Sequence, residues 1–303
     1  MTYPSRAARA PRRARTPADP VRAGADTTGS PRRRAPGSVE TIPASDSQPA
    51  AAESHAPEVG LVVPVLDEAA NVAPLLAEID AAMAGGPAFE AIVVDDGSTD
   101  GTPGELAAAC ARYPWLTALR HDTRAGKSAA LRTGVEAARA PLILTLDGDR
   151  QNDPADLPAL IRRYAAARSA DPRLGLLAGQ RTRRRAGWLR RLSSRIANGV
   201  RARVLGDATR DTACGVKAIP RAVFLALPHF DGLHRFLPAL VKAQGYTVAT
   251  VAVTDRPRAA GQPKYGVWNR LWVGILDMLA VFWLIRRCHR PSGVTSLCER
   301  RRP

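Results

Sequence analysis

The segment FEAIVVDDGSTDGTPGELAAACARY, residues 89–113, contains one strand, one turn and one helix in succession. Its apolar run ends in two aspartates, Asp95 and Asp96, and the turn GSTDGT leads into an alanine-rich stretch. A short apolar run bounded by turn residues predicts a buried strand, and the longer stretch behind it predicts a helix. The segment therefore predicts a strand–helix unit with acidic side chains where the strand ends.

The same alternation continues on both sides of this segment. We expect a first helix with Asn71 as its N-cap and with Gly85 and Gly86 as its stop. Strands that alternate with helices imply right-handed crossovers and a mainly parallel, buried sheet, which places the chain in the α/β class. The other predicted strands are GLVVPVL (60–66), WLTALRH (115–121) and LILTLDGD (142–149), and the other helices are 71–84 and 126–140.

Acidic residues follow two of these strands. Because ligands of parallel sheets bind outside the carboxyl ends of the strands, we expect the two acidic clusters to meet in one crevice. The pair Asp147 and Asp149 suits a divalent cation that bridges a nucleotide diphosphate, since Mg²⁺ or Mn²⁺ needs only one or two carboxylates beside phosphate oxygens and water. The alternative is that the acidic residues lie at the N-terminus of the next helix, where the helix dipole favours negative charge. We accept this interpretation for Asp153 and Asp156.

Two other segments have features of a ligand-binding site. The turn after Asp96 has the spacing of a calcium loop, but Ala107 stands where a glutamate is required and a strand precedes the turn, which excludes an EF-hand. Lys127 opens a predicted helix, where backbone N–H groups and a cation can hold a phosphate. The sequence around it is no P-loop, and a plain surface lysine remains the alternative.

The chain is strongly basic, with 303 residues and a formal net charge of +16. Such an excess indicates a polyanionic partner without choosing among nucleic acid, phosphorylated ligand and anionic lipid. Four cysteines without a CxxC spacing favour a reducing, intracellular compartment. Residues 1–57 are rich in Pro, Arg and Ala without apolar periodicity, and we expect a disordered basic arm.

The basic excess is concentrated again in residues 181–203, which contain nine arginines and no acidic residue. A solvated helix face is one interpretation, and a surface for phosphate or anionic lipid is the other. Nucleic acid is not expected as a partner, because only Trp188 supplies an aromatic side chain there. For Leu271–Ile285 the alternatives are an interfacial helix, a core helix and membrane insertion, the last being costly for Asp277.

Six motifs together resemble glycosyltransferase family 2. The resemblance is strongest to the branch that makes polyprenyl-phosphate sugars, the dolichyl-phosphate mannosyltransferase-like enzymes, and it covers about residues 58–290. It implies a GT-A fold, which we expect over residues 58–258, with a membrane-proximal segment over 259–303. The motifs are VVPVLDEAANV, VVDDGSTDGT, GKSAALRTG, LDGDRQNDP, DTACGVK and PKYGVWNR.

The resemblance also implies roles for single residues, position by position. Catalysis would involve Asp147, Asp149 and Arg181. The metal ligands, for Mg²⁺ or Mn²⁺, would be Asp147, Asp149 and Gln151. The nucleotide-sugar would be bound by Pro64, Glu68, Asp95, Asp96, Lys127 and Asp147. The acceptor phosphate would meet Arg181, Arg191, Ser194 and Arg195. The family often has Asn where this chain has Asp67, and an aromatic residue at Val65.

The implied activity is inverting transfer of a hexose, of the mannose or glucose type, from a nucleoside diphosphate sugar to a polyprenyl phosphate. The enzyme would act in the cytoplasm, peripherally bound to anionic lipid on the inner face of the cytoplasmic membrane. One alternative is a hydroxyl acceptor in cell-envelope glycan or lipid A synthesis, with Asp231 as the base. An alternative of another class is a basic nucleic-acid-binding protein, which leaves the acidic strand ends unexplained.

Overall fold

A computed structural model describes residues 56–181, 199, 201, 203–207, 209, 211–257 and 267–287, with side chains in the last range from residue 274 onward. All of them belong to one compact unit, Glu53–Pro303. The expected arm, apart from its last two residues, lies outside the described residues, and so do Arg191, Ser194 and Arg195.

The core of this unit is a seven-stranded sheet in the order β3-β2-β1-β4-β6-β5-β7. Strands β1, β2, β3 and β4 pair in parallel, as do β5 and β7, whereas β6 runs antiparallel to both of its neighbours. The predicted mainly parallel α/β sheet is confirmed, with β6 as the unpredicted exception. The strands are β1 Val59–Val65, β2 Phe89–Asp95, β3 Leu116–Arg120, β4 Leu142–Thr145, β5 Leu174–Arg181, β6 Lys217–Pro220 and β7 Thr247–Val253.

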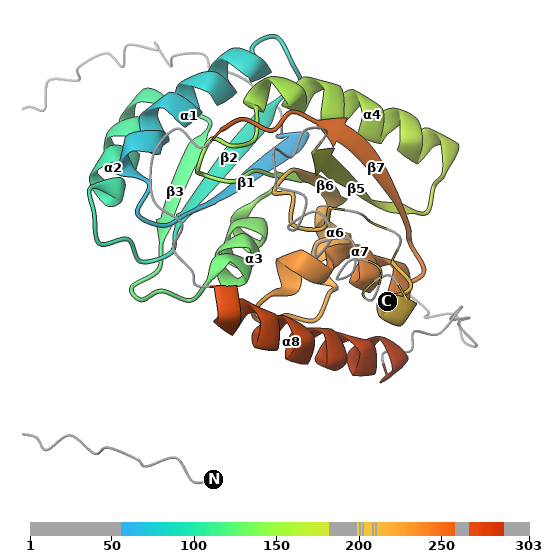
Figure 1. Ribbon diagram of the computed structural model, residues 1–303. Coiled ribbons are helices and arrows are strands. Elements are labelled where there is room, and N and C mark those ends of the chain that lie inside the picture. The colour runs from blue at the N-terminus through green and yellow to red at the C-terminus, as the bar shows by residue number, and fades with distance from the viewer. Residues whose placement is uncertain are drawn as a thin grey trace, which may run out of the picture. The chain divides into compact units, whose positions relative to one another are not determined.

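Helices cover both faces of the sheet (Figure 1). One buried cluster joins α1, α2 and α4 to the sheet, and a second joins α3, α6, α7 and α8 to the other face. The helices are α1 Ala69–Met83, α2 Thr102–Arg112, α3 Lys127–Ala137, α4 Leu157–Ala170, α6 Arg221–Leu225, α7 Leu233–Ala243 and α8 Val267–Arg287, and a short 3-10 turn, Pro154–Asp156, precedes α4.

Helix α3 lies unusually close to the sheet. A Cβ added to Gly134 would overlap Cγ1 of Val62 on β1 and stand 3.3 Å from Cγ2 of Val94 on β2. Only glycine permits this approach, and it fixes the height of the helix above the strands. The N-terminus of α3, with Lys127, is thereby held at the carboxyl edge of the sheet.

Two predicted boundaries were wrong. Helix α1 begins at Ala69 with Glu68 in the N-cap position, so Asn71 is a buried residue of the first turn and not the cap. Its amide Nδ2 donates to Oε2 of Glu68 over 2.6 Å, a local bond that explains the polar pattern at this helix start. Strand β4 ends at Thr145, before the acidic pair, so Asp147 and Asp149 belong to the loop that follows.

Helix α8 packs on the second cluster through Val281, which is buried, while Leu276, Leu279 and Trp283 are exposed. The helix thus has a face that contacts the core and a separate apolar face directed at solvent. Within the part of the chain that the structure describes, no helix is both long and apolar enough to cross a membrane.

Candidate functional site

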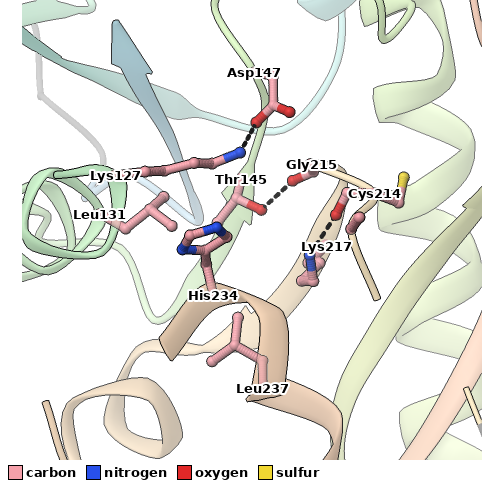
Figure 2. Close-up of a pocket in the computed structure, with 10 residues that line it drawn as sticks. Lys127, Leu131, Thr145, Asp147, Cys214, Gly215, Lys217, His234 and Leu237 are labelled. Atoms are coloured by element: carbon pink, nitrogen blue, oxygen red, sulfur yellow. Dashed lines mark hydrogen bonds and ion pairs between the residues drawn. The ribbon is translucent and has the colours of Figure 1, made fainter. Parts of the chain in front are cut away.

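A small pocket opens at the carboxyl end of β4, where Lys127 from α3 meets Asp147 (Figure 2). The ammonium of Lys127 donates to Oδ1 of Asp147 in a short ion pair, and the Asp147 side chain keeps 27% of its surface exposed. Lys127 and the first aspartate of the D-x-D pair, which the sequence analysis assigned separately to diphosphate and metal, therefore lie in contact in the structure.

Two basic residues that the sequence analysis did not select line the same pocket. Lys217 enters from β6 and is 3% exposed, and its Nζ donates to the carbonyl oxygen of Cys214. His234 enters from α7, and its Nδ1 lies 2.9 Å from Oγ of Ser128 on α3. The pocket thus joins α3, β4, β6 and α7 (Figure 2).

The electrostatics of the pocket follow from this crowding. Burial acts to raise the pKa of Asp147, but Lys127, Lys217 and His234 lower it, and the resulting pKa lies below the ordinary value. Burial and the charge of Lys127 lower the pKa of Lys217 to about 8. Burial and the two lysines lower the pKa of His234 to about 3, so this imidazole is neutral at physiological pH.

The loop before β6 passes directly against the acidic pair. A Cβ on Gly215 would overlap the carboxylate of Asp147, and the carbonyl oxygen of Gly215 accepts a hydrogen bond from Oγ1 of Thr145 over 2.5 Å. The motif DTACGVK therefore supplies a glycine that admits Asp147 and, two residues later, the buried Lys217.

The residues at the end of β4 fit a hard divalent cation. Asp147 and Asp149 are both partly exposed, and Oδ1 of Asp149 accepts from the backbone N–H of Gln151 over 3.2 Å, which joins two of the three predicted ligands within the loop. Among the described residues no three His, Cys, Asp or Glu side chains are grouped to hold a metal ion. Such a cage is not required for Mg²⁺ or Mn²⁺, which take one or two carboxylates and complete their shell with phosphate oxygens and water.

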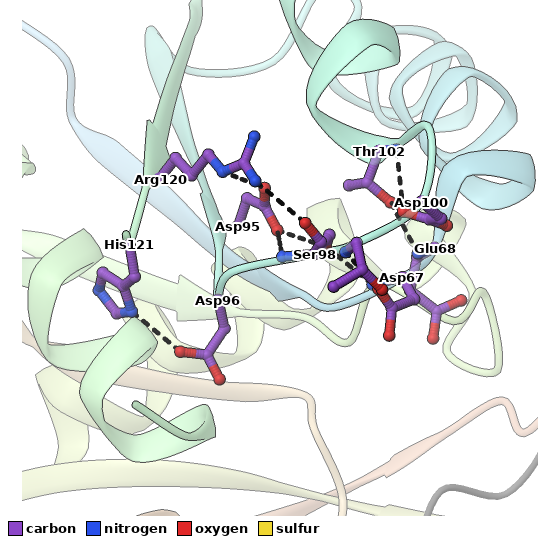
Figure 3. Close-up of polar contacts among 10 residues, drawn as sticks. Asp67, Glu68, Asp95, Asp96, Ser98, Asp100, Thr102, Arg120 and His121 are labelled. Atoms are coloured by element: carbon purple, nitrogen blue, oxygen red, sulfur yellow. Dashed lines mark hydrogen bonds and ion pairs between the residues drawn. The ribbon is translucent and has the colours of Figure 1, made fainter. Parts of the chain in front are cut away.

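The aspartates at the end of β2 organise loops around this edge (Figure 3). Oδ1 of Asp95 accepts from the Ser98 backbone N–H over 2.9 Å and also from the Ser98 hydroxyl, and Oδ2 lies 3.5 Å from Nε of Arg120. Asp95 is 1% exposed. It therefore folds the GSTDGT turn, and the structure gives it no exposed surface for the nucleotide contact that we expected.

Asp96 holds the loop that leads to Lys127. Its Oδ1 accepts from the backbone N–H of Ala125 and its Oδ2 from that of Gly126, both over 2.8 Å, and Nδ1 of His121 lies 2.9 Å from Oδ1 (Figure 3). Gly126 has a φ of 95°, which glycine adopts without strain. These contacts make Asp96 a positioning residue for the N-terminus of α3, and its predicted place beside the base stays a prediction.

The loop after β1 is tied to the same turn. Asp67 has a φ of 44°, its backbone N–H donates to Ser98 Oγ over 2.8 Å, and its Oδ1 accepts from the Thr99 N–H over 2.8 Å. Because Asn and Asp are the side chains that best tolerate this backbone region, the aspartate at position 67 suits this turn as an asparagine would. The backbone N–H of Glu68 donates to Thr102 Oγ1 over 2.8 Å, and Pro64 lies in β1 one strand from Asp95.

Arg181, at the end of β5, is held by carboxylates. Its Nε and Nη2 donate to the two oxygens of Asp211 over 2.8 and 2.9 Å, and Nη1 lies 3.9 Å from Asp255. The hydrogen bonds that Arg181 donates to Asp211 raise the pKa of Arg181, which stays charged. Two carboxylates beside one guanidinium leave a net negative charge, so a phosphate at this place needs further cations.

Lys127, Asp147, Asp149 and Gln151, which were selected from the sequence, thus lie at one edge of the sheet, and Lys217 and His234, which were not selected, line the same pocket. The sequence signal for Lys217 was a lysine at the end of the motif DTACGVK, most of whose residues are small or apolar. The signal for His234 was a histidine at the start of α7, a helix with a strongly apolar face. Neither pattern is specific without the fold that joins them to Asp147.

A sequence model described as Glycosyl transferase family 2 matches residues 61–227. The chain is 35% identical over 240 residues to a dodecaprenyl-phosphate galacturonate synthase of Rhizobium johnstonii, covering 78% of this chain and 69% of the relative. It is 33% identical over 215 residues to an undecaprenyl-phosphate 4-deoxy-4-formamido-L-arabinose transferase of Pseudomonas paraeruginosa, covering 70% of this chain but only 62% of that relative.

Solved structures show the same fold. A glucosyl-3-phosphoglycerate synthase from Mycobacterium tuberculosis, in complex with Mn²⁺, UDP and glucosyl-3-phosphoglycerate, superposes with a TM-score of 0.57 at 21% identity, covering 78% of this chain and 82% of that one. A mannosyltransferase from Pyrobaculum calidifontis, in complex with GDP-mannose and Mn²⁺, gives a TM-score of 0.55 at 21% identity, covering 78% and 66%. The predicted GT-A architecture is confirmed.

Proposed function

The chain belongs to glycosyl transferase family 2, and from this premise we propose that it transfers a sugar from a nucleoside diphosphate sugar to a polyprenyl phosphate. The transfer inverts the anomeric carbon and uses Mg²⁺ or Mn²⁺. Two relatives are named for sugar transfer to a dodecaprenyl or undecaprenyl phosphate, which supports the acceptor class. The narrower donor, a hexose of the mannose or glucose type, stays a prediction, because those relatives are named for other sugars.

The observation that supports this proposal most is the Lys127–Asp147 ion pair beside Asp149 and Gln151. It places a cation and a D-x-D pair at the carboxyl edge of a parallel sheet, where ligands of such sheets bind. A bound Mg²⁺ or Mn²⁺, held by Asp147, Asp149 and Gln151, would neutralise charge on the diphosphate leaving group.

Lys127 has two partners in this proposal. Without donor it neutralises Asp147, and with donor its ammonium can turn to a diphosphate oxygen at the N-terminus of α3, where backbone N–H groups also favour an anion. Asp96 fixes that N-terminus through Ala125 and Gly126. Positioning and charge stabilisation thus account for the donor side of the reaction.

A phosphate acceptor would need no general base. A phosphate monoester has a second pKa of ~6 and is largely dianionic at neutral pH, so its oxygen can attack without losing a proton to the protein. Arg181 remains our proposed contact for that phosphate, assisted by Arg191, Ser194 and Arg195. Asp211 would orient Arg181 rather than disable it, since guanidinium has five N–H donors.

A hydroxyl acceptor is the second candidate, and one observation favours keeping it. The carboxylate of Asp231 is exposed and lies near the N-terminus of α3, where a Cβ on Gly126 would stand 3.3 Å from Asp231 Oδ1. A base at that place could take the proton of an alcohol. Replacement of Asp231 by Asn separates the two: a phosphate acceptor tolerates it and a hydroxyl acceptor does not.

We also propose that the protein works at the inner face of the cytoplasmic membrane. The exposed Leu276, Leu279 and Trp283 of α8, followed by Arg286 and Arg287, suit the boundary between anionic headgroups and acyl chains. In this arrangement residues 58–258 form the catalytic domain and residues 259–303 the membrane-proximal segment. A polyprenyl acceptor would reach the site from that surface.

The test is a donor and acceptor panel. The full chain is incubated with Mg²⁺ or Mn²⁺, radiolabelled nucleotide sugars, and either a polyprenyl phosphate or the matching polyprenol. Label should enter the organic phase with the phosphate and not with the alcohol. Transfer to the alcohol alone would overturn the phosphate acceptor and support the hydroxyl alternative.

A further inference from the structure

Arg150 lies between two predicted metal ligands, Asp149 and Gln151, in the loop of residues 147–153, which we call the metal loop. Its φ is 58°, and among the described residues the only other residue besides glycine with a positive φ is Asp67. This region is uncommon for a residue with a Cβ, and arginine is not one of the types enriched there. Such a conformation persists only where surrounding contacts hold it.

Glu78 on α1 supplies one of these contacts. Nη2 of Arg150 donates to Oε1 of Glu78 in a short ion pair whose side chains are 24% and 27% exposed. Because both side chains are mostly withdrawn from water, their attraction is screened less than that of a surface pair. The second carboxylate oxygen, Oε2, accepts from Nη1 of Arg256 over 2.7 Å. One carboxylate on α1 thus joins two arginines from separate segments.

Arg256, which follows β7, is attached to the metal loop itself. Its backbone N–H donates to the carbonyl oxygen of Gln151 over 2.8 Å, and its Nη2 lies 2.5 Å from Oδ1 of Asp153. Asn152 and Asp255 form an antiparallel bridge beside these contacts. The segment after β7 therefore holds the second half of the metal loop through backbone and side-chain bonds.

The charges of this network are satisfied within the protein. Two arginines, Arg150 and Arg256, face two carboxylates, Glu78 and Asp153, and each of the four takes part in an ion pair. None of these charges requires a bound ligand. The network therefore suits the task of fixing the shape of the metal loop better than that of binding an ion directly.

The shape of the loop matters because rotation about the N–Cα bond of Arg150 turns Asp149 relative to Gln151. We propose that Glu78 is a positioning residue: through Arg150 and Arg256 it holds the metal loop in the conformation that presents Asp149 and Gln151 to one Mg²⁺ or Mn²⁺. This inference rests on the proposed function, which assigns the two ligands, and adds to it a residue 71 positions before the first of them.

The experiment measures metal affinity in Glu78→Gln, which removes the charge and keeps the size of the side chain. The full chain is titrated with Mn²⁺ in the presence of UDP or GDP, and free Mn²⁺ is followed by electron paramagnetic resonance. Because groups that orient metal ligands typically contribute about 10- to 100-fold to metal affinity, Kd for Mn²⁺ should rise by about 10-fold or more. A lower Tm with unchanged Mn²⁺ affinity would show a purely structural ion pair and overturn the inference.

Glu136→Gln is the matched control. It removes the charge of another helical glutamate that pairs with an arginine, Arg132 on α3, and leaves the network around Glu78 intact. It should bind Mn²⁺ as the wild type does. An equal loss of affinity in both glutamine variants would contradict a specific role of Glu78.

Two substitutions of Arg150 test the backbone argument and do not depend on the folding of Glu78→Gln. Arg150→Ala removes the ion pair and leaves a Cβ at a φ of 58°, whereas Arg150→Gly removes the same pair at a residue that adopts this φ without strain. Mn²⁺ affinity should fall in both and fall less in Arg150→Gly. A loss in the glycine variant as large as in the alanine variant would contradict the inference.

Amide hydrogen exchange of the metal-free protein separates the inference from the proposed function. If the wild type binds no Mn²⁺ with either nucleotide, the metal assignment of the proposed function fails, and the hold on the loop is still measurable. The amides of Gln151 and Arg256 should exchange faster in Glu78→Gln than in the wild type, since both lie in the bonds that fix the loop. Equal exchange would show that Glu78 does not hold the metal loop.

Discussion

The backbone of Gly215 lies against the carboxylate of Asp147, so closely that a single added methyl group would overlap the three terminal atoms of that side chain. The loop before β6 and the acidic loop after β4 therefore pack directly against each other. Asp147 also pairs with Lys127, so its position is fixed from two sides by residues far apart in the sequence.

Replacement of Gly215 by alanine should displace Asp147 from the donor site. A shift of about 1 Å in a reacting group can cost about 100-fold in rate, and we expect a loss of that order in kcat/KM for the nucleotide sugar. Steady-state kinetics at several metal concentrations measure it. Gly104→Ala is the control, since nothing lies within 4 Å of a Cβ at that helix position, and an active Gly215→Ala enzyme would contradict the predicted role of Asp147.

Replacement of Asp149 by alanine should abolish metal-dependent transfer and leave the fold intact. Its carboxylate is partly exposed and bonds locally to the Gln151 N–H, so little stability depends on it. Thermal unfolding should change little, and titration with Mn²⁺ in the presence of UDP should show weakened binding. Wild-type turnover in this variant would remove Asp149 from the mechanism.

Arg181 is expected to act on the acceptor, and its ion pair complicates a simple substitution. Arg181→Ala leaves Asp211 and Asp255 without their guanidinium partner. Because the side chains of Arg181 and Asp211 are mostly buried, at 14% and 12% exposure, the substitution should cost about 1–3 kcal/mol of stability. It should also raise KM for the polyprenyl phosphate more than KM for the donor.

A second substitution separates the two effects of Arg181. In the double variant Arg181→Ala/Asp211→Ala the unpaired carboxylate of Asp211 is gone, so part of the stability should return while acceptor use stays impaired. Chemical denaturation and acceptor kinetics report on the two properties independently. Recovery of acceptor KM together with stability would show that Arg181 is only structural.

His234 predicts a pH dependence of stability. Its folded pKa of about 3 lies below the ordinary histidine value of 6.5, so between these values the unfolded chain binds a proton that the folded chain does not. The contribution of His234 is therefore complete above pH 6.5 and is lost as the pH falls toward 3. Tm should fall less steeply over that window in His234→Asn than in the wild type.

The exposed His229 supplies the control for this measurement. His229→Asn should follow the wild-type curve of Tm against pH. If His234→Asn also follows it, the imidazole of His234 is not held neutral by the pocket.

The sequence allowed much of the fold and one side of the site to be predicted. Apolar runs that end in aspartate located β2 and β4 to within a few residues. The rule that ligands bind at the carboxyl ends of parallel strands predicted that the acidic residues after β2 and β4 lie at one edge of the sheet. The start of helix α1 was predicted two residues too late, because Glu68 and Asn71 are both polar and either could precede the first helical residue. Only the hydrogen bond between their side chains shows that Asn71 lies within the helix.

What the sequence could not show depends on contacts across long separations. Lys217 and His234 lie 70 and 87 residues beyond Asp147, and each looks ordinary in its own segment. Strand β6 gave no local sign that it would insert antiparallel between β4 and β5. Since that insertion places Lys217 in the pocket, its burial and its charge interaction with Asp147 appear only in the folded chain.

The most direct test of the transfer reaction is the nucleotide that it releases. Purified protein with a divalent cation, a polyprenyl phosphate and an accepted nucleotide sugar should yield nucleoside diphosphate in a one-to-one ratio with a polyprenyl monophosphate sugar, as measured by chromatography and mass spectrometry. Release of nucleoside monophosphate with a polyprenyl diphosphate sugar, or hydrolysis of the donor without a lipid product, would contradict the account.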